Sequence, residues 1–140
     1  MSFAAILAPV FVQVALIYGL LLHLAILRAR AVRRGAVVVQ DAALDTSVWP
    51  PEALQAGNCF DNQFQIPLLF FVLAGLEIVT WQADFVFVVL SWVFVASRLA
   101  HAFIHATSNR LPHRFAAFLT GALILLVLWV HFAVKIFTGL

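Results

Sequence analysis

Three ionisable side chains stand at helical spacing near the end of a long apolar stretch. Arg98, His101 and His105 occupy positions i, i+3 and i+7, so an α-helix places them on one face. Inside a membrane such groups are costly unless they face a partner, water or a ligand. Guanidinium and imidazole groups on one face predict either the wall of a polar binding site or a helix end that meets solvent.

A second polar stripe begins the preceding apolar stretch. Asn58, Asn62 and Gln65 lie at i, i+4 and i+7, and Asp61 stands beside them. Pro67 follows directly, which predicts a kink just past the stripe. Amide side chains on one helix face can bind a ligand, or they can hydrogen-bond to a neighbouring helix and only hold it in place.

The two stripes are expected at the same depth. The apolar stretches that carry them are antiparallel and joined by a short turn near Gln82, and both rise about 1.5 Å per residue. This matching depth favours a shared polar cleft over two unrelated helix ends. The predicted levels are Arg98 with Gln65 and Ile66, His101 with Gln63, and His105 with Cys59.

A metal site is the next hypothesis for the histidines. His101 and His105 have the i, i+4 spacing at which two imidazoles can share a metal, and Asp61 or His113 could add a third ligand. The chain has only five histidines, fewer than a membrane di-iron hydroxylase needs. We therefore expect no metal. Glu77 is expected to have a structural role, reaching interfacial water or a polar neighbour across a subunit contact.

The composition predicts an all-α integral membrane protein. Of 140 residues, 65% are hydrophobic and 10% charged, and a soluble domain of this size could not bury that much apolar surface. Four apolar stretches are long enough to cross the hydrocarbon layer as a four-helix bundle, and in lipid each must be helical. The expected spans are residues 3–27, 57–80, 85–108 and 115–137 of a single domain, residues 1–140.

Basic residues predict the orientation. Four arginines lie in the first loop, residues 28–56, and Arg110 and Arg114 lie in the third. The positive-inside rule places both loops in the cytoplasm and both termini outside. Seven of the eight basic residues are arginine, which hints at a high-GC bacterial genome and so at a bacterial inner membrane. Membrane lipids are expected partners, and nucleic acid is not.

Over nearly its whole length the chain resembles the MAPEG family, the membrane-associated proteins in eicosanoid and glutathione metabolism. The likeness lies in the length, the four spans, the long first loop and two short motifs. In span two the segment Asn62-Gln63-Phe64-Gln65-Ile66-Pro67 stands where the family has R-x-x-x-N-x-x-E leading into proline. In span three Ser97-Arg98-Leu99-Ala100-His101, with His105 beyond it, is most similar to the divergent bacterial branch.

The resemblance implies a homotrimer that binds glutathione between neighbouring subunits near the cytoplasmic face. It implies that Arg110 or Arg114 stabilises the glutathione thiolate for catalysis, since a nearby cation lowers a thiol pKa. The implied activity is that of a glutathione-dependent transferase or peroxidase acting on lipophilic electrophiles. The residues implied in glutathione binding are Asn58, Asn62, Gln65, Arg98, His101 and His105.

The chain also departs from the family pattern. Gln65 replaces a glutamate, Asn58 replaces an arginine, and His101 and His105 stand where eicosanoid-making members often have tyrosines. Eicosanoid synthesis is therefore not expected. The alternative is a non-catalytic protein of the same fold that binds a lipid head group or an anionic metabolite.

Overall fold

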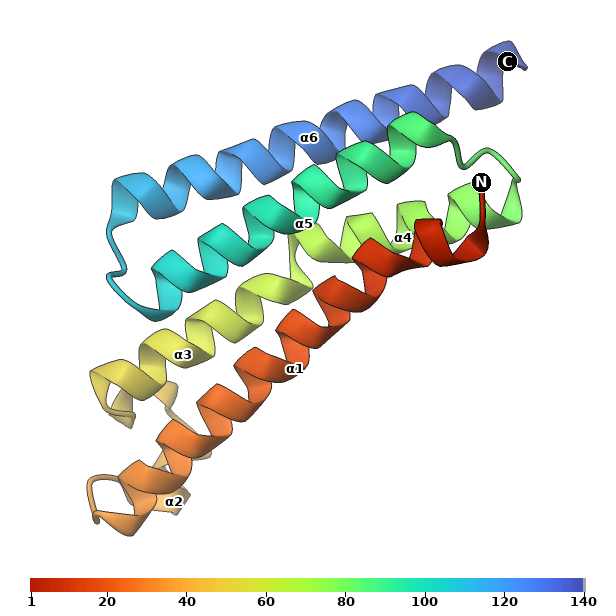
Figure 1. The fold of residues 1–140 in the computed structure, drawn as a ribbon. Helices are drawn as coiled ribbons and strands as arrows, with labels where there is room; N and C mark the ends of the chain where they lie inside the picture. Colours follow the sequence, from red (N-terminus) through yellow and green to blue (C-terminus); the bar gives the residue numbers. More distant parts are fainter. Residues whose placement is uncertain (140) are drawn as a thin grey trace.

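The computed structural model describes residues 1–139, and all regular structure in that range is helical (Figure 1). Four helical units are long and apolar enough to cross a membrane, so the chain is an integral membrane protein. The elements in order are α1 (Phe3–Arg33), α2 (Val39–Ala42), η1 (Thr46–Val48), α3 (Pro51–Asp61), η2 (Asn62–Phe64), α4 (Ile66–Val79), α5 (Phe85–Ala106) and α6 (Leu111–Thr138).

The helices extend beyond several of the predicted span limits. The first continues to Arg33, beyond the span limit at residue 27. The second helix begins at Pro51, where the sequence Pro50-Pro51-Glu52 favours a helix start, and enters the span expected from residue 57 already helical. The fourth begins at Leu111 instead of residue 115, whereas the third ends at Ala106, two residues early. Hydropathy delimits only the lipid-embedded part of a helix. Polar first and last turns, such as the one opened by Pro51 and Glu52, continue the helix in water.

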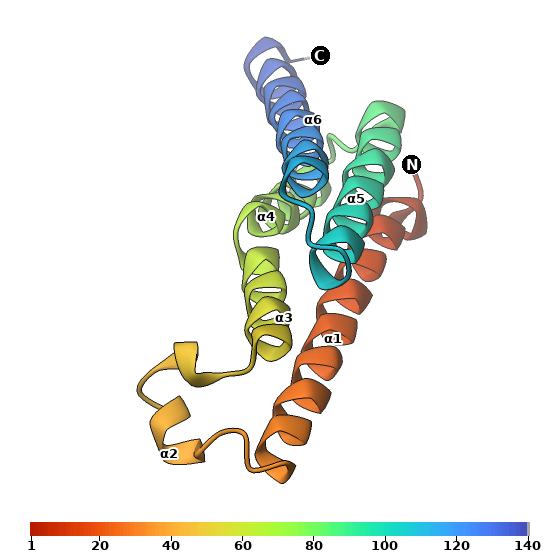
Figure 2. The same cartoon turned by 90° about the vertical axis from the view of Figure 1, so that its left-hand side faces the viewer.

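The second unit is interrupted in its middle. α3 ends at Asp61, a 3₁₀ turn follows, and Gln65 has φ −93° and ψ −105°, outside the helical region, before α4 begins. Pro67 lies in the first turn of α4. Its ring lacks an N–H and clashes with the carbonyl four residues earlier, so a continuous helix is disfavoured. The predicted kink is therefore a break that begins before the proline, and Figure 2 shows α3 and α4 as separate segments.

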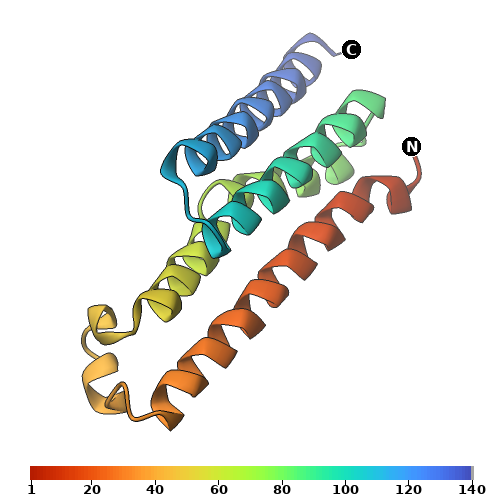
Figure 3. The same cartoon turned by 60° about the vertical axis from the view of Figure 1, so that its left-hand side comes forward.

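α5 is the central helix of the bundle. α6 packs along it, while α1 packs against both α3 and α5 (Figures 1 and 3). In the most apolar segment of each helix, 50% is buried in α5 but only 17% in α1. The main apolar core lies between these helices, where Phe70 of α4 packs on Phe94 of α5 with ring centroids 4.9 Å apart. α5 thus carries its polar stripe into the interior of the bundle.

Gly121 sets the close approach of α6 to α5. A Cβ atom there would lie 2.6 Å from Ser97 Oγ, a distance that side chains do not tolerate. Ser97 Oγ in turn donates to the carbonyl of Phe94 at 2.6 Å. The absent side chain at Gly121 therefore brings the two helices together at the level of Ser97 and Arg98.

Large apolar side chains cover the outside of the single chain. Phe11, Leu22 and Val130 are each more than half exposed, and many other large apolar side chains are exposed as well. In a membrane these groups meet lipid tails or other apolar surfaces, so their exposure does not carry the cost it has in water.

Candidate functional site

The two polar stripes meet through a hydrogen bond between Arg98 and Asn62. Nη2 of Arg98, on α5, donates to Oδ1 of Asn62, the first residue of η2, at 2.5 Å. Asn62 also donates from Nδ2 to Oε1 of Gln65 at 3.2 Å. The polar faces of the two units therefore converge.

The observed register differs from the predicted one by about one helical turn. Arg98 reaches Asn62 rather than Gln65 or Ile66, and the carbonyl of His105 accepts from Gln55 rather than lying level with Cys59. The prediction treated the second unit as one straight helix. The break at Gln65 redirects α3, so residues before it take a different level along α5.

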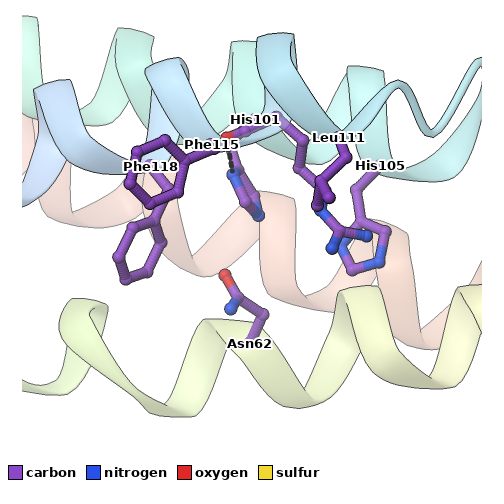
Figure 4. A pocket seen from close by; sticks show the side chains of 7 residues that line it. Asn62, His101, His105, Leu111, Phe115 and Phe118 are labelled. Carbon is purple, nitrogen blue, oxygen red and sulfur yellow. Dashed lines mark hydrogen bonds between the residues drawn. The ribbon is translucent and has the colours of Figure 1, made fainter.

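A cavity of about 170 Å³ opens beside this contact. Figure 4 shows Asn62 on one side, facing the side chains of α5 and α6 on the other. Its polar lining therefore comes from three separate elements. The lining residues are Asn62, His101, His105, Leu111, Arg114, Phe115 and Phe118.

The two histidines present unpaired ring nitrogens in this region. Nδ1 of His101 lies 3.0 Å from the carbonyl oxygen of Arg114, and because a carbonyl only accepts, Nδ1 carries the proton. Nε2 of His101 and Nδ1 of His105 are buried without a partner. His101 therefore offers Nε2 to a ligand as a hydrogen-bond acceptor when its ring is neutral.

Arg98 brings a positive charge with no carboxylate beside it. The side chain is fully buried, and its Nε and Nη1 have no hydrogen-bond partner. Within residues 1–139 every ion pair involves Asp84 or Glu77, at the opposite end of α5. A buried charge without a counter-charge costs several kcal/mol, on the order of 3–5 when a partner is removed. Arg98 does not line the cavity itself, but it is hydrogen-bonded to Asn62, which does, and its positive charge favours an anionic group there.

The two candidate catalytic arginines occupy different places. Arg114 lines the cavity, and its Nη1 donates to Oδ1 of Asn109 at 2.7 Å. Arg110 lies in a separate open depression with Ser108 and His113. The structure thus brings Arg114, but not Arg110, to the cavity that Asn62 lines.

Two of the predicted ligand-binding residues, Gln65 and Asn58, do not line the cavity. Gln65 is exposed and contacts the site only through Asn62. Asn58 is exposed and does not line the cavity. Within the described range, no group of three His, Cys, Asp or Glu side chains comes together in a way that could hold a metal.

The sequence did not single out several residues that lie in or near the site. Gln13 of α1 donates from Nε2 to Oε1 of Gln63 at 3.1 Å, and both side chains are fully buried. Gln63 in turn donates to the carbonyl of Cys59 at 3.2 Å. The available signal was one amide side chain in the middle of the first apolar stretch. Nothing in the sequence indicated that Phe115 and Phe118 line the cavity, because aromatic residues are frequent throughout the spans.

Comparison with known proteins gives one match. The model of the MAPEG family matches residues 6–134, nearly the whole chain. No curated protein and no solved structure matches it.

Proposed function

Because the chain belongs to the MAPEG family, we propose that it binds glutathione and transfers it to lipophilic electrophiles, or uses it to reduce them. The family includes glutathione transferases and related membrane proteins. The proposed site is the cavity between Asn62, α5 and the start of α6. The cofactor is glutathione, and the second substrate is a small apolar molecule that arrives through the lipid.

The observation that supports this function is the uncompensated charge at Arg98. Its buried Nε and Nη1 are unpaired donors, and Arg114 adds a second guanidinium to the same region. Glutathione carries two carboxylates and, once ionised, a thiolate. Charge-assisted hydrogen bonds from arginine to such groups are about twice as strong as neutral ones.

The proposed chemistry begins with ionisation of the thiol. Arg114 stabilises the thiolate, since a nearby cation lowers the thiol pKa and the thiolate is the better nucleophile. The free Nε2 of His101 can accept the thiol proton. The sulfur then forms a bond to the electrophilic carbon, and the leaving group departs with its electron pair. We prefer Arg114 to Arg110 for this role because Arg114 lines the cavity.

We further propose that three copies of the chain form the working unit, with the cavity at the contact between neighbours. The cavity is open on one side, and large apolar side chains surround the single chain. Loops one and three, which carry six arginines, face the cytoplasm of a bacterial cell in this proposal.

A second candidate function is binding of a lipid head group or an anionic metabolite without catalysis. The observation that favours it is the absence of any carboxylate among the residues that line the cavity. The ammonium group of glutathione therefore finds no counter-charge among these lining residues. An anion that lacks an ammonium group needs no carboxylate in the cavity.

The test is a titration of the purified protein with glutathione, followed by the ultraviolet absorbance of the thiolate. We expect a saturable thiolate signal that Arg114→Ala removes and Arg110→Ala, the matched control, keeps. Turnover of a model electrophile should likewise be lost in Arg114→Ala and kept in Arg110→Ala. If millimolar glutathione gives no signal and a lipid or anionic metabolite stays bound through purification, the second candidate replaces the first.

A further inference from the structure

A second polar cluster lies at the other end of α5, where α4, α5 and α6 meet. Asp84 is its most fully bonded member. Its carboxylate accepts from the N–H of Phe87 at 2.8 Å, from Nε2 of His131 at 2.8 Å and from Nζ of Lys135 at 3.0 Å. Lys135 also donates to the carbonyl of Gln82. Asp84 therefore takes most of the positive charge available at this end.

Glu77 is left with little compensation. Its side chain is fully buried, and neither carboxylate oxygen has a hydrogen-bond partner. The nearest cation is Nζ of Lys135 at 3.9 Å, which is too long for a hydrogen bond. Two carboxylates share one lysine, so the cluster keeps one negative charge when His131 is neutral. A buried carboxylate in this state needs a further cation or donor.

A small cavity borders Glu77. Its volume is about 90 Å³, equal to the space of about three water molecules in the liquid. Phe3 and Trp81 stand edge to face on its wall, with ring centroids 6.0 Å apart and an interplanar angle of 64°. The cavity thus joins one unpaired carboxylate to aromatic and aliphatic side chains. The lining residues are Met1, Phe3, Ile6, Glu77, Ile78, Trp81 and Ala83.

We propose that this cavity binds an organic ammonium ion, with Glu77 as its counter-charge and Phe3 and Trp81 as its aromatic wall. Aromatic faces attract ammonium groups, and the carbon atoms of the ligand fit an apolar lining. Calcium requires six to eight oxygen ligands and magnesium about six, whereas this lining offers one carboxylate. The ammonium group can belong to a free amine or to the head group of a zwitterionic lipid.

Two cations of the chain itself stand near this site. Lys135 is held by Asp84 and the Gln82 carbonyl, as described above. The α-amino group of Met1 belongs to a lining residue but forms no ion pair with Glu77 in the structure. Within residues 1–139, Glu77 has only the 3.9 Å ion pair with Lys135 and no hydrogen bond, so its carboxylate oxygens can still accept from an external ammonium.

The test uses the full chain in nanodiscs of phosphatidylglycerol, titrated with ethanolamine hydrochloride against sodium chloride of equal ionic strength. We expect a saturable rise in Tm with ethanolamine. Glu77→Gln should weaken the apparent affinity at least about tenfold, the usual scale for loss of a charge-assisted hydrogen bond. Asp41→Asn, which changes an exposed carboxylate of the first loop, should leave it unchanged.

A second arm separates the two sources of the ammonium group. Native mass spectrometry of the protein from mixed phosphatidylethanolamine and phosphatidylglycerol discs should show phosphatidylethanolamine retained by the wild type and lost in Glu77→Gln, if the ligand is a lipid. If Glu77→Gln does not fold, Phe3→Ala with Trp81→Ala tests the aromatic wall with Glu77 intact. Equal behaviour of wild type and variants in both arms would overturn the proposal.

Discussion

Arg98 lies inside the bundle, and in the part of the chain that the structure describes it hydrogen-bonds to an amide and not to a carboxylate. Replacing a buried charge by an apolar side chain of similar volume is often neutral or stabilising. We expect Arg98→Met to leave the Tm of the glutathione-free protein unchanged or higher. Glutathione affinity should fall at least about tenfold, because charge-assisted hydrogen bonds are lost. Thermal unfolding with and without glutathione measures both effects, and an undiminished glutathione shift in Arg98→Met would contradict them.

The ionisation of Asp84 makes the stability of the fold depend on pH. Burial alone would raise the pKa of its carboxyl, but hydrogen bonds from Phe87, His131 and Lys135 outweigh burial and lower the pKa from 3.8 to about 2. The folded state therefore binds the proton less tightly than the unfolded state. The stabilisation is fully present well above pH 3.8 and is lost as the pH falls through 2.

This dependence can be measured by comparing Asp84→Asn with wild type. Asparagine can still cap α5 by accepting from the Phe87 N–H, so the helix start is kept while the charge is removed. We expect wild type to be the more stable protein at pH 6 and the difference to shrink between about pH 4 and pH 2. Equal stability of the two proteins at every pH in that range would show that Asp84 acts only as a helix cap.

At the scale of the helices, the contact between α5 and α6 depends on Gly121. A methyl group there meets Ser97 Oγ, so Gly121→Ala should destabilise the protein by about 1–3 kcal/mol, the usual cost of overpacking. In a Ser97→Ala background most of this cost should disappear, because the clashing atom is gone. A double-mutant cycle of unfolding free energies measures the coupling.

Gly75 of α4 is the matched control for this experiment. A Cβ added there meets nothing within 4 Å. Gly75→Ala should therefore stabilise the helix by about 0.5–1 kcal/mol, the usual gain for alanine over glycine in a helix. Equal effects of alanine at the two glycines would show that the close approach at Gly121 does not matter.

The sequence predicted the elements better than their mutual positions. Four apolar stretches gave the four spanning units, and the period of Arg98, His101 and His105 placed them on one buried face of α5. The partner of Arg98 was misplaced by a turn because hydropathy does not reveal that Pro67 breaks the helix at Gln65. Spacing within one helix is a local property, whereas register between helices depends on every bend between them.

At the scale of the whole molecule, the exposed apolar surface and the open cavity lead to a prediction about assembly. A purified, detergent-solubilised particle should contain three copies of the 15.5 kDa chain. Mass measured by light scattering with the detergent contribution subtracted tests this number. A stable monomer that still binds glutathione with full affinity would refute a site shared between subunits.

The break at Gln65 divides the walls of the proposed glutathione cavity between two parts of the bundle. α5 and α6 are held at close distance by Gly121, so the lining side chains of His101 and Arg114 lie on one closely packed pair of helices. Asn62 precedes the break, in a segment joined to α4 through the non-helical Gln65. Hydrogen bonds tie that segment to α1 through Gln13 and Gln63 and to α5 through Gln55 and the His105 carbonyl. We therefore expect any movement that widens the proposed cavity to break these hydrogen bonds and to leave the packing of Phe70 on Phe94 in place.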